Sequence, residues 1–272
     1  GPRIVPATGS IGDGAFLDGL FAGGGFDAVF HLAASLTSEA EADLGLGLSV
    51  NVEGLLALLA RCRAQKTPPR FVFASSIAVF GGELPETVED DTRRVPRTSY
   101  GTQKLIAENL LADHARQGAL DGRALRLPIV LTRPGAPNPA VSDRIAAVIR
   151  EPLLGRDVAI GLRPDTLLPL VTVQRVASAL RATHEMPAEA FPLSRAINLP
   201  ALTATPAELV AAVERRGAVG RVSWAPDPAL QAVVDGWPRR FRSAVAERHG
   251  IHAVADTDAV VDAFLADLQP HG

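Results

Sequence analysis

The stretch Arg70-Phe71-Val72-Phe73-Ala74-Ser75-Ser76 is a short apolar run that ends in two hydroxyl side chains. A near-continuous apolar run is typical of a strand that is buried on both faces of a parallel sheet. Ligands of open α/β sheets bind outside the carboxyl ends of the strands, so Ser76 lies where a ligand is expected. The stretch therefore predicts an α/β fold with a parallel sheet and a binding site at the end of this strand.

Tyr100 and Lys104 follow in a Tyr-x-x-x-Lys pattern, and residues four apart lie on one face of a helix. Tyr100 is the only tyrosine of the chain, and Lys104 and Lys66 are its only lysines among 27 basic residues. A neighbouring ammonium favours the phenolate and lowers the pKa of a tyrosine, which suits it for proton transfer. We predict a helix from Ser99, as its N-cap, to about Gln117. The alternative for the pair is a half-buried Tyr beside a solvated Lys.

Composition limits the possible functions. A chain of 272 residues with 47% apolar residues can bury a large core, as one domain with a lobe or as two small domains. A net charge of −3 argues against a nucleic-acid partner, and a single cysteine argues against disulfides and a metal cluster. We expect no metal and no membrane span or signal peptide, and hence a cytoplasmic enzyme. The chain starts at Gly1 without an initiator Met, so we expect a fragment, a processed product or the ordered part of a longer chain.

The order Ser75-Ser76-x-x-Val79-Phe80-Gly81, then Tyr100-x-x-x-Lys104, resembles the extended short-chain dehydrogenase/reductase superfamily, also called the NAD-dependent epimerase/dehydratase family. The resemblance implies a Rossmann-like, doubly wound parallel sheet with a small C-terminal α/β substrate lobe. It implies Ser76, Tyr100 and Lys104 as the catalytic group. Phe80 departs from the Tyr that is usual in this loop, which keeps the ring and loses the hydroxyl.

The same resemblance implies NAD as the cofactor. His31-Leu32-Ala33-Ala34, at the end of a predicted buried strand Phe26–Leu32, is similar to the family's segment along the pyrophosphate and ribose. Small side chains there let a ligand approach the backbone, whereas a core position is the alternative for His31. The implied cofactor-binding residues are Ser10, Ile11, Leu32, Ala33, Ala34, Asn51, Ala74, Tyr100, Lys104, Pro128, Ile129 and Val130. For Asn51 a purely structural role is equally open, because a buried Asn needs hydrogen-bond partners.

The glycines of Gly9-Ser10-Ile11-Gly12-Asp13-Gly14 permit two interpretations. A dinucleotide phosphate loop is the weaker one, because the strand predicted before it, Arg3–Val5, is short and the helix after it, Ala15–Phe21, is barely two turns. The segment better resembles the family's later turn at the adenine ring, and Asp13 is a candidate helix N-cap. We expect the family's first β-α-β unit, with its glycine-rich loop and the residue that discriminates NAD from NADP, to be missing from the chain.

Further elements are predicted from local patterns. We predict strands at Ala124–Leu127, Leu167–Val173, Ala196–Leu199 and Val222–Trp224. We predict helices at Ser38–Arg63, Ser142–Arg150, Gln174–His184, Thr205–Arg215 and Asp256–Leu268. The expected parts are a Rossmann domain, residues 1–133 and about 165–199, and a substrate-binding lobe, residues 134–164 and 200–272.

Substrate contacts are predicted near the loop Glu83–Arg97 and the Pro-rich stretch Arg133–Pro139. The candidate substrate-binding residues are Ser38, Ser75, Ser76, Asn138, Ser142 and Arg144. For the last three, a Pro-rich linker followed by a solvated helix face is the alternative.

Several strings, among them Ser38-Glu39-Ala40-Glu41-Ala42-Asp43 and Asp235-Gly236-Trp237-Pro238, resemble one branch of the family, the D-erythronate dehydrogenases. This implies NAD-dependent oxidation of the C2 hydroxyl of a small sugar acid, above all D-erythronate to 2-oxo-tetronate. A nucleotide-sugar epimerase or dehydratase is the first alternative, and a non-catalytic dinucleotide-sensing protein is the second. Family members pair through two long helices, here Asp43–Arg63 and Tyr100–Gln117, so we expect a homodimer.

Overall fold

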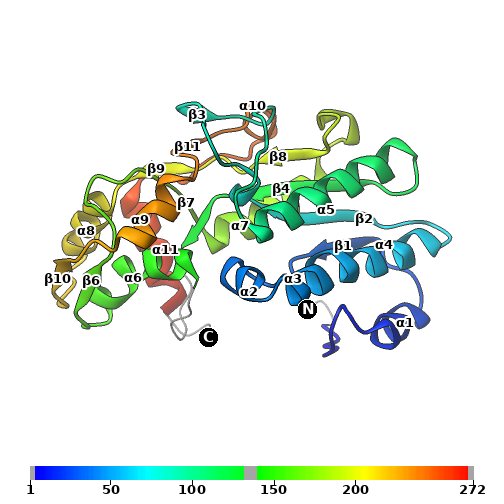
Figure 1. The fold of residues 1–272 in the computed structure, drawn as a ribbon, viewed down its shortest axis with the longest axis horizontal. Helices are drawn as coiled ribbons and strands as arrows, with labels where there is room; N and C mark the ends of the chain where they lie inside the picture. The colour runs from blue at the N-terminus through cyan, green and yellow to red at the C-terminus, as the bar shows by residue number, and fades with distance from the viewer. Residues whose placement is uncertain (1–3, 132–139, 269–272) are drawn as a thin grey trace.

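A parallel sheet with the strand order β1-β2-β4-β8 forms one half of the molecule (Figure 1). The computed structural model describes residues 4–131 and 140–268. The strands are β1 (Ala28–His31), β2 (Arg70–Ser76), β4 (Gly122–Leu127) and β8 (Ala196–Asn198). All three pairings are parallel, which confirms the predicted α/β class. The predicted strand Phe26–Leu32 is shorter than expected and only partly buried, because it lies at the edge of this sheet.

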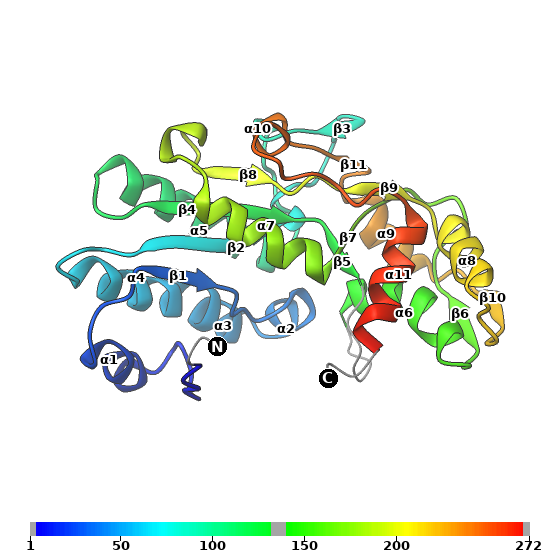
Figure 2. The ribbon, with the colours of Figure 1, turned by 180° about the vertical axis from the view of Figure 1, so that it is seen from behind.

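Helices cover both faces of this sheet (Figures 1 and 2). On one face, α1 (Gly14–Ala22), α4 (Gly54–Ala64) and α5 (Ser99–Arg116) pack against Phe71 and Phe73. On the other face, α7 (Val173–Glu185) packs against Val72 and its neighbours in β4 and β8. Successive side chains of a strand point to opposite faces, which is why adjacent residues of one apolar strand serve two cores. The Rossmann-like, doubly wound arrangement is thus confirmed.

The helical run before α4 differs from the single helix predicted. It is divided into α2 (Thr37–Ala42), α3 (Leu44–Leu48) and a π-helical turn, Ser49–Glu53, that continues into α4. The break falls at Asp43, whose extended backbone ends α2 and whose carboxylate accepts a hydrogen bond from the backbone N–H of Leu46 at 2.9 Å. A capping aspartate inside an apolar run starts a new helix there.

Two local predictions are wrong. Ile4 and Val5 form no strand and are 85% and 70% exposed. The N-cap of α5 is Thr98, whose hydroxyl accepts from the N–H of Gly101 at 3.0 Å, while Ser99 is the first helical residue. The cap at Asp13 and the helix end at Gln117 are confirmed.

A second, smaller half follows the main sheet. Its three-stranded sheet has the order β5-β7-β9, with β5 (Ile129–Leu131), β7 (Leu168–Thr172) and β9 (Leu202–Ala204). Three helices share its core: α6 (Val141–Leu153), α8 (Pro206–Arg215) and α11 (Thr257–Leu268). A capping box between Thr205 and Glu208 begins α8, at the start predicted for this helix. At the outer end β6 (Val158–Ile160) pairs with β10 (Val222–Trp224), beside α9 (Pro228–Asp235).

The two halves are interwoven. β7 lies in the smaller sheet, whereas α7, which follows it directly, covers the main sheet. The loop after β2 forms a 3-10 turn, Ile77–Val79, and then β3 (Thr87–Val88), which pairs with β11 (Arg240–Phe241) just before α10 (Ala244–Arg248). The residue boundaries given above for the two parts stay a prediction.

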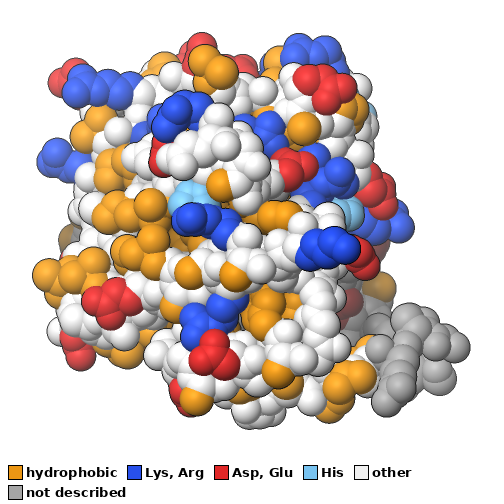
Figure 3. Space-filling model, turned by 90° about the vertical axis from the view of Figure 1, so that its right-hand side faces the viewer, with side chains coloured by type: hydrophobic (Ala, Val, Ile, Leu, Met, Phe, Trp, Pro, Cys, Tyr) orange, Lys and Arg blue, Asp and Glu red, His pale blue; other side chains and the backbone are white. Residues whose placement is uncertain are grey.

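An ion-pair cluster stabilises the edge of the main sheet where the strands begin. Asp121 contacts Arg70, Arg123 and Arg195, and the fully buried Arg123 also donates to carbonyls at the end of α7, including that of Met186 at 2.6 Å. The loops of this edge lie at the end of the molecule that Figure 3 shows, where Lys and Arg side chains are interspersed with Asp and Glu. The cluster has a structural role. A ligand site is therefore expected at the opposite edge, where the strands end.

Candidate active site

Ser76 and Tyr100 meet at the carboxyl end of β2. Ser76 is the last residue of the strand, and its Oγ accepts a hydrogen bond from the backbone N–H of Ala78 at 3.1 Å. Tyr100 lies in the first turn of α5, and its hydroxyl is hydrogen-bonded to the Ser76 side chain. Because the Ser76 oxygen already accepts from Ala78, its own hydroxyl proton is available to the Tyr100 oxygen.

Lys104 lies one helical turn further along α5 and is 3% exposed. Its Nζ donates to the carbonyl oxygen of Ala74 at 2.8 Å and lies 4.5 Å from the centroid of the Phe73 ring. The same Nζ is 5.4 Å from the centroid of the Tyr100 ring. The structure thus brings together the three residues that the sequence predicts as catalytic.

The electrostatics of this group differ from the prediction. Burial raises the pKa of the Tyr100 hydroxyl to about 12, and the hydrogen bond from Ser76 acts in the opposite direction. Burial lowers the pKa of the Lys104 ammonium to about 7, while the charge of Glu108 raises it. The prediction of a lowered Tyr100 pKa is therefore wrong for this geometry, because removal of the phenol from water outweighs the neighbouring groups.

Asn51 connects three parts of the chain. Its side chain accepts from the N–H of Ser35 at 2.9 Å, donates to the Ser35 carbonyl at 3.0 Å and donates to Oε1 of Gln103 at 2.7 Å. These bonds tie the loop after β1 to the residue that precedes Lys104. They support the structural interpretation of Asn51, and they identify Gln103 as a partner that the sequence analysis missed.

Ser75, a predicted substrate contact, has a different position. It is 2% exposed, and its hydroxyl donates to Oε1 of Glu108 at 2.6 Å. Strand side chains alternate between faces, so Ser75 points beneath α5 while Ser76 reaches the end of the sheet. The structure corrects this prediction and shows Glu108 and Arg126, a buried ion pair with an N–O distance of 2.9 Å, under the site. The spacing of Glu108 from Lys104, one further turn of the same helix face, is the signal that could have identified it.

The residues after β1, together with Lys104, fit the predicted pyrophosphate and ribose part of a dinucleotide. Leu32 is 57% exposed and Ala33 is exposed, so a small-residue surface lies at the carboxyl end of β1, next to that of β2. Lys104 uses one N–H on Ala74, and an ammonium has three, so a donor remains for a ribose hydroxyl. The donor set therefore suits this cofactor.

The other predicted cofactor residues lie in several places. Ser10 Oγ accepts from the N–H of Gly12 at 3.2 Å in an exposed turn. Ile11 lies against α4, where a Cβ on Gly54 would be 3.0 Å from its Cγ1. Ala34 follows β1, while Pro128 and the strand of Ile129 and Val130 follow β4, with Ile129 buried in the core of the smaller half.

The described substrate candidates come from three elements, α2, β2 and α6. Ser38 is exposed on α2, and Ser142 lies in the first turn of α6. Arg144 forms an ion pair with Asp227 at 2.8 Å, which occupies the guanidinium proposed for an anionic substrate. Asn138 lies outside the described residues.

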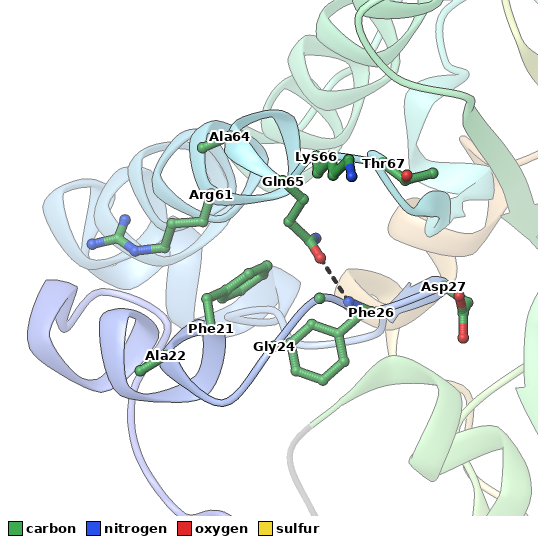
Figure 4. A pocket seen from close by; sticks show the side chains of 11 residues that line it. Phe21, Ala22, Gly24, Phe26, Asp27, Arg61, Ala64, Gln65, Lys66 and Thr67 are labelled. Atoms are coloured by element: carbon green, nitrogen blue, oxygen red, sulfur yellow. Dashed lines mark hydrogen bonds between the residues drawn. The ribbon is translucent and has the colours of Figure 1, made fainter.

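A separate cavity of about 620 Å³ lies at the amino end of β1, near Phe21, Phe26, Lys66 and Thr67 (Figure 4). There the side chain of Gln65 accepts from the N–H of Phe26 at 2.6 Å. The strands are parallel, so this cavity is at the edge of the sheet opposite to Ser76. It is distinct from the candidate active site.

Comparison with known proteins decides the family. Residues 6–198 match the model of the NAD dependent epimerase/dehydratase family. The chain belongs to this family. A similar relative in it is the D-erythronate dehydrogenase of Cupriavidus necator, which is 40% identical over 243 residues, or 88% of this chain and 75% of that protein. The predicted membership is confirmed, and the predicted enzyme class, an NAD-dependent dehydrogenase acting on CH–OH, agrees with the name of this relative.

Solved structures of the family have the same fold. The nucleoside-diphosphate-sugar epimerase from Agrobacterium tumefaciens is 30% identical, with a TM-score of 0.89 over 96% of this chain and 78% of its own. The GalE-like L-threonine dehydrogenase from Cupriavidus necator, in its holo form, is 26% identical, with a TM-score of 0.88 over 97% of this chain and 85% of its own. Members with this fold thus carry names from more than one reaction type, so the fold alone does not name the substrate.

Proposed function

We propose that this protein oxidises the C2 hydroxyl of a small sugar acid, D-erythronate, to 2-oxo-tetronate with NAD. The observation that carries the proposal is the convergence of Ser76, Tyr100 and Lys104 at the carboxyl end of β2, in a chain 40% identical to a D-erythronate dehydrogenase. A cytoplasmic location is part of the proposal.

Each side chain has a distinct role in this proposal. The Tyr100 oxygen takes the proton of the substrate hydroxyl, and Ser76 hydrogen-bonds that hydroxyl and then the carbonyl oxygen that replaces it. The Lys104 charge favours the phenolate of Tyr100, in opposition to the burial that raises its pKa. Ala33 and Ala34 would lie along the pyrophosphate and ribose of NAD, Lys104 would hold its nicotinamide ribose, and the bound cofactor would supply the acceptor for the hydride of C2.

The direct test measures NADH formation with D-erythronate, L-threonate and related four-carbon acids, using protein of verified intact mass, with NADP in parallel. Tyr100→Phe should lower turnover by at least about three orders of magnitude while NAD affinity stays nearly intact. Turnover of D-erythronate by the wild type together with an inactive Tyr100→Phe variant supports the proposal. Undiminished turnover in that variant contradicts the assigned role.

An epimerase acting on a nucleotide sugar is the second candidate, because the epimerase from Agrobacterium tumefaciens shares the fold over most of both chains. It predicts conversion of a UDP-sugar without net NADH formation. A protein that ignores every sugar acid and converts the nucleotide sugar would replace the first proposal with this one.

We also propose a homodimer formed through the outer faces of α3, α4 and α5. Leu44, Leu48 and Leu56 are 56%, 38% and 43% exposed along one side of this run, and a groove of about 440 Å³ between Leu48 and Ile106 lies beside them.

Among the described residues, Leu44–Ala64 is the single helical run whose length and composition suit a membrane span. Its other side packs into the core through Leu55, Leu58, Leu59 and Cys62.

Light scattering tests the dimer. Leu48→Glu should convert it to a monomer, because a carboxylate in an apolar interface is left without a partner. Leu193→Glu, at a position that is 99% exposed in the turn before β8, is the matched control and should remain dimeric. A wild type that is monomeric at high concentration contradicts the proposal.

A further inference from the structure

Glu108 is a fully buried carboxylate that the proposed reaction does not use. It is 0% exposed and lies four residues after Lys104 in α5, on the same helix face. A buried carboxylate so close to a catalytic ammonium requires a physical explanation, because burial of a charge is unfavourable unless the charge is paired.

The orientation of Glu108 is fixed from three sides. Ser75 of β2 donates to it at 2.6 Å, and Arg126 of β4 donates from Nε at 2.9 Å and from Nη2 at 3.0 Å. Arg94, from the loop after β3, donates at 3.1 Å. Two guanidinium groups and a hydroxyl thus hold the Glu108 carboxylate in place one helical turn from Lys104.

In the part of the chain that the structure describes, the other contacts of Lys104 supply no negative charge. From β2 it meets the Ala74 carbonyl and the Phe73 ring, and from its own helix it meets Tyr100. Burial, and then the charge of Lys104, lower the pKa of His31 of β1 to about 4, so this ring is neutral near pH 7. Burial alone drives Lys104 towards the neutral amine, and the charge of Glu108 opposes this.

We propose that Glu108 is a positioning residue for the reaction: its carboxylate, held by Ser75 and Arg126 one helical turn from Lys104, acts through the buried Lys104 side chain beside Tyr100. The role of Lys104 in turnover rests on the proposed function. The coupling of Glu108 to Lys104 is independent of that function, because it can be measured without substrate. The competing interpretation is that Arg126 neutralises Glu108 completely, so that the pair serves only the packing of α5 on the sheet.

The composition of the chain makes the measurement direct. Lys104 and Lys66 are the only lysines, so protein labelled with ¹³C at lysine Cε gives two signals, one buried and one exposed. In the wild type the Lys104 signal should titrate near pH 7, as its lowered pKa implies. In Glu108→Gln its midpoint should fall by about one pH unit or more. An unchanged midpoint overturns the proposal.

Two further variants control for folding and position. Glu108→Gln leaves the Arg126 charge buried without its partner, so the double variant Glu108→Leu, Arg126→Met removes both charges and should fold. It should show the same fall of the Lys104 midpoint. Asp113→Asn, an exposed acid of the same helix, is the matched control and should leave the midpoint unchanged. A fall in Asp113→Asn as large as in Glu108→Gln also overturns the proposal.

Activity supplies an independent readout. Glu108→Gln should lose about fivefold more kcat at pH 8 than at pH 6, with the substrate KM little changed, because the protonated fraction of Lys104 falls earlier as the pH rises. A pH-independent loss indicates packing alone and contradicts the proposal. If the Lys104 midpoint moves but the wild type oxidises no sugar acid, the coupling is supported and the proposed function fails.

Discussion

Gly101 lies directly against the carbonyl oxygen of Ala78, so that a Cβ added to Gly101 would fall 2.1 Å from that oxygen. The first turn of α5 therefore packs backbone to backbone on the 3-10 turn that follows Ser76. This close approach places the Tyr100 hydroxyl beside Ser76. The glycine between the tyrosine and the lysine is thus required by packing across the site.

Gly101→Ala should separate α5 from the turn after β2. We expect kcat/KM to fall about 100-fold or more and the free energy of unfolding to fall by about 1–3 kcal/mol, because neither backbone can yield without strain. Gly19→Ala is the matched control, since Gly19 is also helical but has no atom within 4 Å of an added Cβ. It should gain up to about 1 kcal/mol in stability from helix propensity. Wild-type turnover in Gly101→Ala contradicts the packing argument.

Asn51→Ala should lower the free energy of unfolding by about 2–4 kcal/mol in urea titrations. The substitution leaves the backbone N–H and carbonyl of Ser35 and the amide of Gln103 without their partner in a buried region. Asn109→Ala, at an exposed position of α5, is the control and should change stability by less than about 0.5 kcal/mol. Equal effects of the two substitutions would show that the Asn51 bonds are not required.

Lys104→Met should stabilise the protein while it abolishes turnover. The pKa of Lys104 is about 7 in the folded state and 10.5 as the ordinary value. Between these pH values the unfolded state binds a proton that the folded state does not bind. The free energy of unfolding therefore falls as the pH falls from 10.5 to 7. At pH 7 the variant should therefore be about 3 kcal/mol more stable, after allowance for the lost bond to Ala74. Urea titrations should show this advantage shrinking as the pH rises to 10, and a constant difference would contradict it.

His31 should make the protein sensitive to acid. Burial lowers its pKa from 6.5 to about 4, with a smaller contribution from Lys104. The unfolded state therefore binds more protons between pH 6.5 and 4, and stability falls by about 3 kcal/mol across that window. His31→Phe keeps an aromatic ring against Phe73 and should flatten this part of the pH–stability curve. His252→Gln, at an exposed position, should retain the wild-type slope. An identical slope in His31→Phe would assign the acid sensitivity to other groups.

Local sequence patterns determined the elements and the three central residues of the site. Apolar runs predicted β2, β4 and β8, and cap residues at Asp13 and Thr205 predicted where helices begin, because these signals depend on residues next to one another in the chain. Ser76 at a strand end and the spacing of Tyr100 and Lys104 follow from the same periodicities. Local patterns did not show which of two adjacent hydroxyl residues, Thr98 or Ser99, is the N-cap of α5.

Only the tertiary structure decided the partners and the charges. Arg144 meets Asp227, and Glu108 meets Arg126, across long separations in sequence that no local pattern encodes. The pKa of Tyr100 is raised and not lowered because desolvation depends on how every neighbouring element packs. Spacing along a helix determines which side chains share a face, whereas the water they lose and the charges they meet are properties of the folded chain.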